Sequence, residues 1–171
     1  ALLHSAHAKL LAVRNQRIRP GRDEKILTAW NALTVRGLAL AGRIFQRPEW
    51  LALADQVLAF IQRDLWQQQR LLASYSQGQA EFAAYLDDYT FLAEALLERL
   101  ASGWNAHYFD WLQQLLQVLF DHFQDARKGG FYFTADDHEA LITRPKPFHE
   151  DALPCANGVL TRLLLRLGRL L

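Results

Sequence analysis

Apolar residues recur along most of the chain every three to four positions, which is the period of an amphipathic helix. Residues 49–66 and 106–124 place their apolar side chains on one stripe and acids, glutamines and arginines on the other. Residues 2–17 follow the same one-sided pattern. We expect each of these segments to form a helix with one face packed and the other in water.

Two further segments are apolar on several sides. Residues 26–45 carry large apolar side chains well away from the main stripe, and so does the segment 82–100. Another helix is expected to start near Asn157. Helices that are apolar almost all round are buried between layers, so we predict that these are inner helices.

Inner and outer helices therefore alternate, with short returns between them. This order is typical of helical hairpins curled into a double-layered ring, and an ordinary helical bundle is the alternative. We predict an all-α domain over residues 1–171 that forms about half of an (α/α)6 toroid. The chain has no methionine and ends inside an apolar helical pattern, so we interpret it as a fragment of a larger domain.

Longer segments precede the inner helices. An alternating stretch, "GGFYFT", a polar turn and "ALITR" predict a β-hairpin over residues 129–144, and "LLASYS" with "QGQ" predicts a weaker one. If the inner helices are parallel, these segments all lie on one face of the ring. Function is concentrated on such loops.

Acids and aromatic residues introduce each inner helix. Carboxylates accept hydrogen bonds from sugar hydroxyls or move protons, and aromatic rings stack on sugar faces, so the pattern indicates a carbohydrate site. We take Asp87 and Asp88 as candidate catalytic residues. The candidate substrate-binding residues are Asp23, Trp30, Asn31, Tyr85, Tyr89, His149, Asp151 and Asn157.

Structural explanations compete with each of these assignments. Acids in a first turn are stabilised by the helix dipole without any function, and Asp23 fits a helix N-cap. Trp30 and Tyr85 also fit a hydrophobic core. A cavity that joins Asp23, Trp30, Asp88 and Asn157 would favour a ligand site, whereas core packing there would favour a scaffold.

Composition narrows the possible functions. With 19 basic and 18 acidic residues the net charge is +1, which favours neither nucleic acid nor an anionic membrane as a partner. The single cysteine, Cys155, excludes an internal disulfide and fits the cytoplasm. Phosphate-loop, dinucleotide and nucleophile-elbow motifs are absent, and we expect no metal and no cofactor.

Three motifs carry a family resemblance. "RPGRDEKILTAWNAL", "YLDDYTFLAEALLE" and "GGFYFTADDHEALITRPKPFHEDALPCANGV" resemble the C-terminal helical region of the thioredoxin-domain-containing, spermatogenesis-associated family. The resemblance implies an N-terminal thioredoxin-like domain followed by an (α/α)6 toroid, similar to those of the N-acylglucosamine 2-epimerases and six-hairpin glycosidases. The family usually has Ser-Gly where this chain has Cys155-Ala156, and it has no settled reaction.

Two functions follow as hypotheses. The first is a domain that binds or processes a carbohydrate, with a sugar or other small polar molecule as ligand. The second is a non-catalytic helical scaffold that positions a redox domain or a protein partner. In both cases the expected partners include the remaining half of the toroid and the thioredoxin-like domain. Uncovered inner faces also predict that the chain self-associates or exposes unusual apolar surface.

Overall fold

The computed structural model describes residues 2–139 and 142–171. Its helices are α1 (Leu2–Asn15), α2 (Thr28–Ile44), α3 (Pro48–Phe60), α4 (Leu86–Leu100), α5 (Ala106–Val118) and α6 (Ala156–Leu170). Single π-helical turns, η1 (Ile61–Leu65) and η2 (Leu119–Phe123), extend α3 and α5. The strands are β1 (Ile26–Leu27), β2 (Trp66–Gln67), β3 (Arg70–Ser76) and β4 (Gln79–Ala83).

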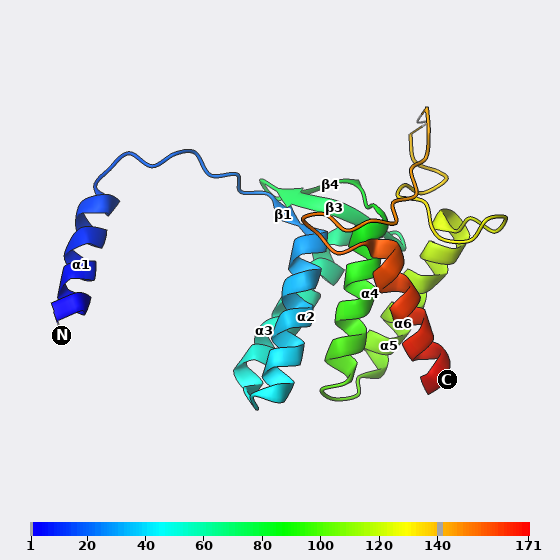
Figure 1. The fold of residues 1–171 in the computed structure, drawn as a ribbon, viewed down its shortest axis with the longest axis horizontal. Coiled ribbons are helices and arrows are strands. Elements are labelled where there is room, and N and C mark those ends of the chain that lie inside the picture. Colours follow the sequence, from blue (N-terminus) through cyan, green and yellow to red (C-terminus); the bar gives the residue numbers. More distant parts are fainter. Residues whose placement is uncertain (1, 140–141) are drawn as a thin grey trace.

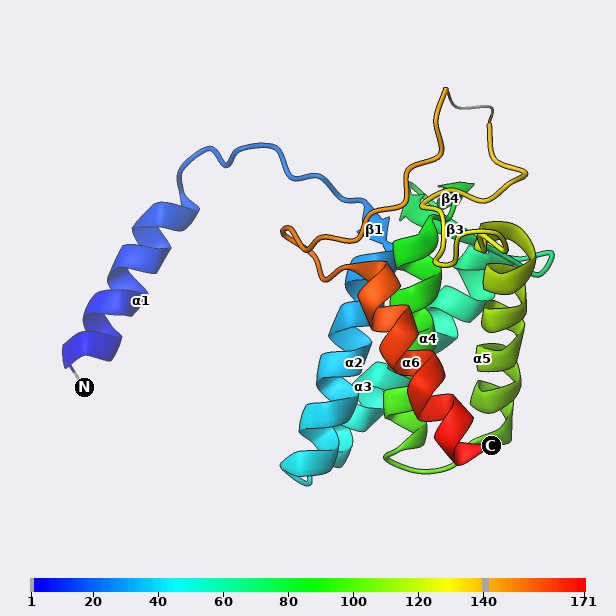
Figure 2. The ribbon, with the colours of Figure 1, turned by 45° about the vertical axis from the view of Figure 1, so that its right-hand side comes forward.

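Five helices form two layers. Helix α4 packs between α2 and α6 in one layer, while α3 and α5 pack behind α2 and α4 (Figures 1 and 2). The helices α2, α4 and α6 all start beneath the strands and the long loop that precedes α6, so they are parallel (Figure 1). This confirms the predicted alternation of inner and outer helices and the shared face for the longer loops.

Helix α4 is the centre of the core. Every one of its residues is buried except Asp87 and Arg99. The largest fully buried side chains around it include Trp111, Phe123 and Leu58, which come from the outer elements. The prediction of an inner helix is confirmed here, because α4 contacts protein on nearly all of its sides.

Helix α2 is less enclosed than its pattern predicted. Ala32, Val35 and Ala39 are buried, but Trp30 and Ile44 are each 60% exposed. Helix α1 carries no buried residue at all and is joined to α2 by an extended segment, residues 16–25 (Figure 1). The one-sided pattern of α1 therefore has no packing partner among the described residues.

The small sheet covers the start of the inner helices. β3 pairs antiparallel with β1, β2 and β4, and the register places Leu72 opposite Ala83 and Ile26 opposite Tyr75. The hairpin predicted around "LLASYS" is thus confirmed. Helix α4 begins later than predicted, because the segment around Phe82 forms β4 and Phe82 itself has a φ of 62°.

The second predicted hairpin, over residues 129–144, is not formed by the described residues. Phe131 makes an isolated bridge with Gln124, and the N–H of Phe133 donates to Pro145 O at 2.8 Å. Part of the predicted second strand, residues 140–141, lies outside the described residues. Loop 124–155 is held instead by side chains that bond its backbone.

Asn157 is the main anchor of that loop. Its Oδ1 accepts from Phe131 N at 2.8 Å, and its Nδ2 donates to Phe131 O and Pro147 O, each at 3.0 Å. At the loop base the Asp125 carboxylate accepts from Arg127 N, Lys128 N, Tyr132 Oη and Lys146 Nζ. These contacts fix the loop above the start of α6.

Candidate functional site

The two adjacent acids of α4 occupy different environments. Asp88 is buried: its Oδ1 accepts from Ala29 N and its Oδ2 from Tyr85 N, each at 2.9 Å. Burial raises the pKa of Asp88 to about 7, although the two backbone N–H groups act in the opposite direction and the charge of Asp87 adds to the rise. Asp88 therefore joins the starts of α2 and α4, and we call this pair of hydrogen bonds the Asp88 clamp.

Asp87 points away from this clamp, because consecutive helical residues are about 100° apart. Its side chain is half-buried and lines a cavity of about 320 Å³. Burial alone raises its pKa, and among the described residues no hydrogen bond or ion pair opposes that rise. Asp87 is thus a partly desolvated carboxylate that has no hydrogen-bond or ion-pair partner in the described part of the chain.

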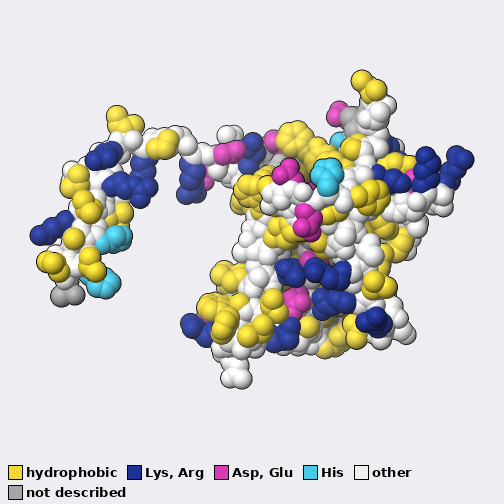
Figure 3. Space-filling view, viewed as in Figure 1, with side chains coloured by type: hydrophobic (Ala, Val, Ile, Leu, Met, Phe, Trp, Pro, Cys, Tyr) yellow, Lys and Arg dark blue, Asp and Glu magenta, His cyan; other side chains and the backbone are white. Residues whose placement is uncertain are grey.

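The loop before α6 forms much of the wall of this cavity, which we call the Asp87 cavity. Its lining residues are Asp87, Phe133, Pro147, His149, Asp151, Ala152, Leu153, Pro154, Cys155 and Ala156. Acidic and histidine side chains gather above the starts of the inner helices on this face (Figure 3). The cavity combines two carboxylates, an imidazole and an aromatic ring, which are the groups needed to hold hydroxyls and move protons.

Three predicted site residues therefore meet in one cavity: Asp87, His149 and Asp151. Tyr85 lies beside it as the N-cap residue of α4, and its ring stacks on Phe133 with centroids 5.0 Å apart. Phe133 is an aromatic wall that the sequence did not single out. Its place in the alternating "GGFYFT" stretch was the available signal, but the side that faces the cavity depends on how the loop folds.

Two other predicted binding residues are used inside the protein. Tyr89 is 1% exposed, and its hydroxyl accepts a hydrogen bond from Leu71 N at 2.8 Å. Asn157 is buried and bonds the loop backbone as described above. Their polar atoms are satisfied by protein groups, so both are structural residues here.

The remaining predicted residues lie at the start of α2 or before it. Asn31 donates to Leu27 O at 2.9 Å, and Trp30 is exposed rather than in the core. The N-cap prediction for Asp23 is wrong, because Leu27 precedes the first residue of α2. Asp23 is exposed and accepts from Lys25 N at 3.2 Å, which lowers its pKa.

The described residues form no cavity that joins Asp23, Trp30, Asp88 and Asn157, the observation that would have favoured a ligand site there over a scaffold. Asp88 and Asn157 are buried among core groups, whereas Asp23 and Trp30 face solvent. This observation counts against a ligand site at that position. The candidate site is instead the Asp87 cavity, between the start of α4 and the loop that leads into α6.

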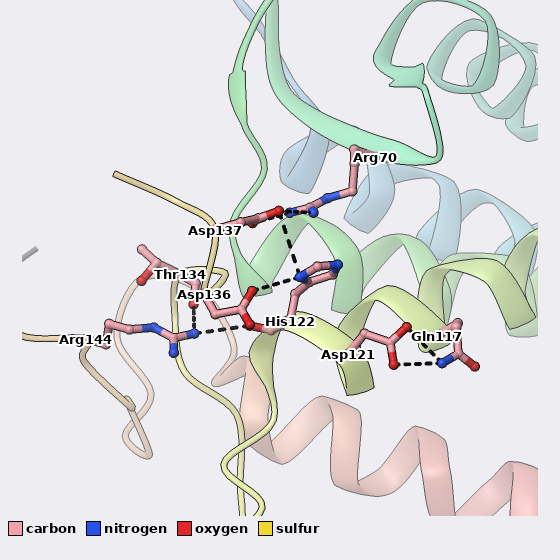
Figure 4. Close-up of polar contacts among 8 residues, drawn as sticks. All are labelled: Arg70, Gln117, Asp121, His122, Thr134, Asp136, Asp137 and Arg144. Carbon is pink, nitrogen blue, oxygen red and sulfur yellow. Dashed lines mark hydrogen bonds and ion pairs between the residues drawn. The ribbon is translucent and has the colours of Figure 1, made fainter. Parts of the chain in front are cut away.

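A separate polar cluster has ligand types suited to a metal. His122, Asp136 and Asp137 bring one potential ligand atom each to within 4.8 Å of one another. Asp137 is already paired with the Arg70 guanidinium, with one contact at 2.8 Å, and His122 Nδ1 lies 2.8 Å from Asp136 Oδ1 (Figure 4). The arginine supplies the positive charge, so this cluster links η2, β3 and the loop without needing a cation.

No model of a known protein family matches the chain. The chain is 28% identical over 177 residues to human spermatogenesis-associated protein 20, an alignment covering 97% of the chain and 22% of that protein. The mouse protein of the same name is 29% identical over 178 residues, an alignment that covers 98% of this chain and 22% of the mouse protein. The chain is thus homologous to about a fifth of these relatives, which confirms the resemblance of its motifs.

Solved sugar epimerases and isomerases share the fold. The cellobiose 2-epimerase of Spirochaeta thermophila aligns with a TM-score of 0.67 and 17% identity over 85% of this chain and 38% of that one. A D-mannose isomerase aligns with a TM-score of 0.54 and 13% identity, over 65% of this chain and 31% of the isomerase chain. These toroids confirm the predicted fold class. No helix within the described residues has the length and apolarity to cross a membrane.

Proposed function

We propose that this chain binds or processes a carbohydrate in the Asp87 cavity. The observation that carries the proposal is the half-buried carboxylate of Asp87, which has no partner within residues 2–139 and 142–171, in one cavity with His149, Asp151 and Phe133. The likeness to toroids whose solved members include a cellobiose 2-epimerase and a D-mannose isomerase supports it at the level of the fold.

Each group has a defined part in this proposal. Asp87 accepts a hydrogen bond or a proton from a sugar hydroxyl or C–H centre, and its raised pKa brings it closer to neutral acid–base chemistry. His149 and Asp151, on the loop, complete the acid–base set. Phe133, stacked on Tyr85, offers a rigid apolar surface to the sugar ring.

The experiment is a sugar-library binding screen on the purified protein, repeated with Asp87→Asn. We expect at least one mono- or disaccharide to bind the unaltered protein and to lose affinity on Asp87→Asn. Removing a charged hydrogen-bond partner typically costs about 1.5–3 kcal/mol, or roughly 10- to 150-fold in affinity. Binding that survives the substitution places the sugar elsewhere.

A scaffold is the second candidate function. It is favoured by the structural use of Asp88, Tyr89 and Asn157, and by an apolar groove of about 650 Å³ at the opposite ends of α4 and α6. In this case no sugar binds in the screen and a protein or redox domain co-purifies through that groove. The two functions thus predict opposite results in the sugar-binding screen and in the co-purification of a protein partner.

A further inference from the structure

The inner helices carry two rungs of arginine and glutamate side chains. In each rung a buried glutamate of α4 lies between an arginine of α2 and an arginine of α6. The upper rung is Arg36–Glu94–Arg162, and the lower rung is Arg43–Glu98–Arg166. On the face shown in Figure 3, basic side chains form a band with acidic side chains among them, below the loops.

The glutamates are enclosed and the arginines are not. Glu94 and Glu98 are 2% and 5% exposed, whereas the side chains of Arg36 and Arg162 are 34% and 55% exposed. One carboxylate faces two guanidinium groups in each rung, so each rung keeps one positive charge. A single arginine would neutralise the buried carboxylate, and the second leaves donors available to a further acceptor.

The upper rung borders a polar cavity beside the candidate site. Arg36, Glu94 and Arg162 line a cavity of about 430 Å³ together with Leu33, Glu150, Pro154, Gly158 and Val159. Arg36 Nε is buried and makes no aligned hydrogen bond, although it lies 3.1 Å from Glu94 Oε2. The Arg36 side chain is 34% exposed and lines this cavity, while its Nε stays against Glu94.

The start of α6 adds to the positive field. Gly158 and Val159 belong to its first turns, and its N-cap residue, Cys155, provides no side-chain cap. The free N–H groups of a helix start favour a negative charge. This cavity and the Asp87 cavity share Pro154 as a lining residue, so the two are adjacent.

We propose that Arg36 and Arg162 bind the anionic group of an acidic sugar, a carboxylate or a phosphate, whose ring occupies the Asp87 cavity. The planar guanidinium fork matches both oxyanions. This inference rests on the proposed function and names its substrate class. Glu150 also lines this cavity and offsets the remaining positive charge of the upper rung, so the arginines hold the anion through directed hydrogen bonds rather than through net charge.

The lower rung supplies a matched control. Arg43 comes from the same helix as Arg36 and pairs with the corresponding glutamate, Glu98, at 2.6 Å. Arg166 lines the apolar groove at the other end of α6 rather than the polar cavity. Loss of Arg43 thus removes a comparable ion pair at a distance from the proposed anion site.

The test measures binding of glucose, glucuronate, glucose 6-phosphate and inorganic phosphate by calorimetry. The proteins are the unaltered chain, Arg36→Gln, Arg162→Gln, Arg43→Gln and Glu94→Gln, with folding checked by circular dichroism. We expect at least one acidic sugar to bind at least about tenfold more tightly than glucose, and Arg36→Gln or Arg162→Gln to remove that advantage. Arg43→Gln is expected to leave it intact.

Glu94→Gln separates recognition from mere packing. It keeps both arginines and raises the charge of the upper rung, so an anion site gains affinity and becomes more sensitive to salt. A structural triad would lose stability without gaining affinity. Should Arg36→Gln fail to fold, the more exposed Arg162 carries the same test.

Failure of the inference is distinguishable from failure of the proposed function. If neutral and acidic sugars bind equally and both depend on Asp87, the carbohydrate function stands and the anion site is overturned. If phosphate binds in an Arg36-dependent manner while every sugar fails, the anion site stands and the carbohydrate function falls. Equal losses on Arg36→Gln and Arg43→Gln also overturn the anion site.

Discussion

Asp88 on α4 accepts a hydrogen bond from the backbone N–H of Ala29 on α2, a residue 59 positions earlier, at 2.9 Å. Its second oxygen accepts from the N–H of Tyr85, the N-cap of its own helix. One carboxylate thereby satisfies an unpaired donor at the start of each of two inner helices. The two adjacent aspartates of α4 therefore have different roles: Asp88 forms a buried clamp, and Asp87 lines an open cavity.

Asp88→Ala tests the clamp. The substitution leaves the buried N–H of Ala29 and the part-buried N–H of Tyr85 without their partner, and the buried one is expected to cost about 1–3 kcal/mol. Urea denaturation of this variant should show the loss. Asp87→Ala is the matched control and should change the free energy of unfolding by less than about 1 kcal/mol. Equal losses in the two variants would contradict the assignment of the clamp to Asp88.

The raised pKa of Asp88 predicts how stability depends on pH. The pKa of an unfolded aspartate is about 3.9, and burial raises the pKa of folded Asp88 to about 7. Between these values the native state holds more protons than the unfolded state, so the free energy of unfolding falls as pH rises. The slope contributed by this group is at most about 1.4 kcal/mol per pH unit.

Chemical denaturation at a series of pH values checks this expectation. Asp88→Asn cannot titrate, so its profile should lack that fall between about pH 4 and 7 even though the variant is weaker overall. Its amide oxygen can still accept from Ala29, but its NH₂ group cannot accept from Tyr85. Parallel profiles for the variant and the unaltered chain would show that Asp88 does not titrate in this range.

Helical periodicity in the sequence predicted the helices that pack through a stripe of apolar side chains. The inner character of α4 followed from apolar residues on all sides, and the structure buries all of it except Asp87 and Arg99. The start of α4 was placed too early because Phe82 fits the helical stripe. In the structure the pairing of β4 with β3 takes that segment into the sheet.

The site could be predicted only in part, because it is built from contacts between distant residues. The aromatic and acidic residue types before each inner helix led to the prediction of Asp87, His149 and Asp151, and the structure places these three residues in one cavity. Nothing in the local pattern showed that Asn157 would reach Phe131, or that Glu94 would meet Arg36 and Arg162. The glutamates inside an otherwise apolar helix were the available sign that partners on α2 and α6 exist.

Gly130 tests the attachment of the loop. Its φ is +74°, and a Cβ there would lie 2.9 Å from Phe148 Cζ and 3.3 Å from Asn157 Oδ1. Gly129 has the same φ, with nothing within 4 Å of its Cβ position. Gly129→Ala should therefore cost about 1–2 kcal/mol for the left-handed backbone, and Gly130→Ala about 1–3 kcal/mol more for the overlap.

Thermal or urea unfolding of the two glycine variants measures the difference between them. Because Phe148 precedes His149, Gly130→Ala should also disturb the wall of the Asp87 cavity and weaken any ligand bound there. Equal destabilisation by the two substitutions would mean that the loop adjusts freely around Asn157.

The apolar groove at the ends of α4 and α6 predicts self-association. Its lining residues include Leu97, Leu100, Trp104, Phe109, Leu167 and Leu170, and Trp104 is 70% exposed. We expect light scattering to detect dimers or larger species that Trp104→Glu disperses, because a charge in the groove opposes burial. Phe82→Glu, at an exposed position on β4, is the control. A monomeric unaltered chain would contradict this prediction.

The separate positions of the two acids give the sharpest test of the candidate site. Burial raises the pKa of Asp87, which means that the charged form is disfavoured in the folded protein. Asp87→Asn removes this charge, so the melting temperature should stay the same or rise slightly. Ligand affinity should fall about 10- to 150-fold. Asp88→Asn should instead lower the melting temperature, and its folded fraction should still bind ligand. His149→Gln and Asp151→Asn share the cavity with Asp87 and are expected to behave as Asp87→Asn does. Calorimetry and melting curves on the same four variants measure both properties. If Asp87→Asn retains full binding while only Asp88→Asn reduces it, the ligand lies at the clamp between α2 and α4, and the Asp87 cavity is not the site.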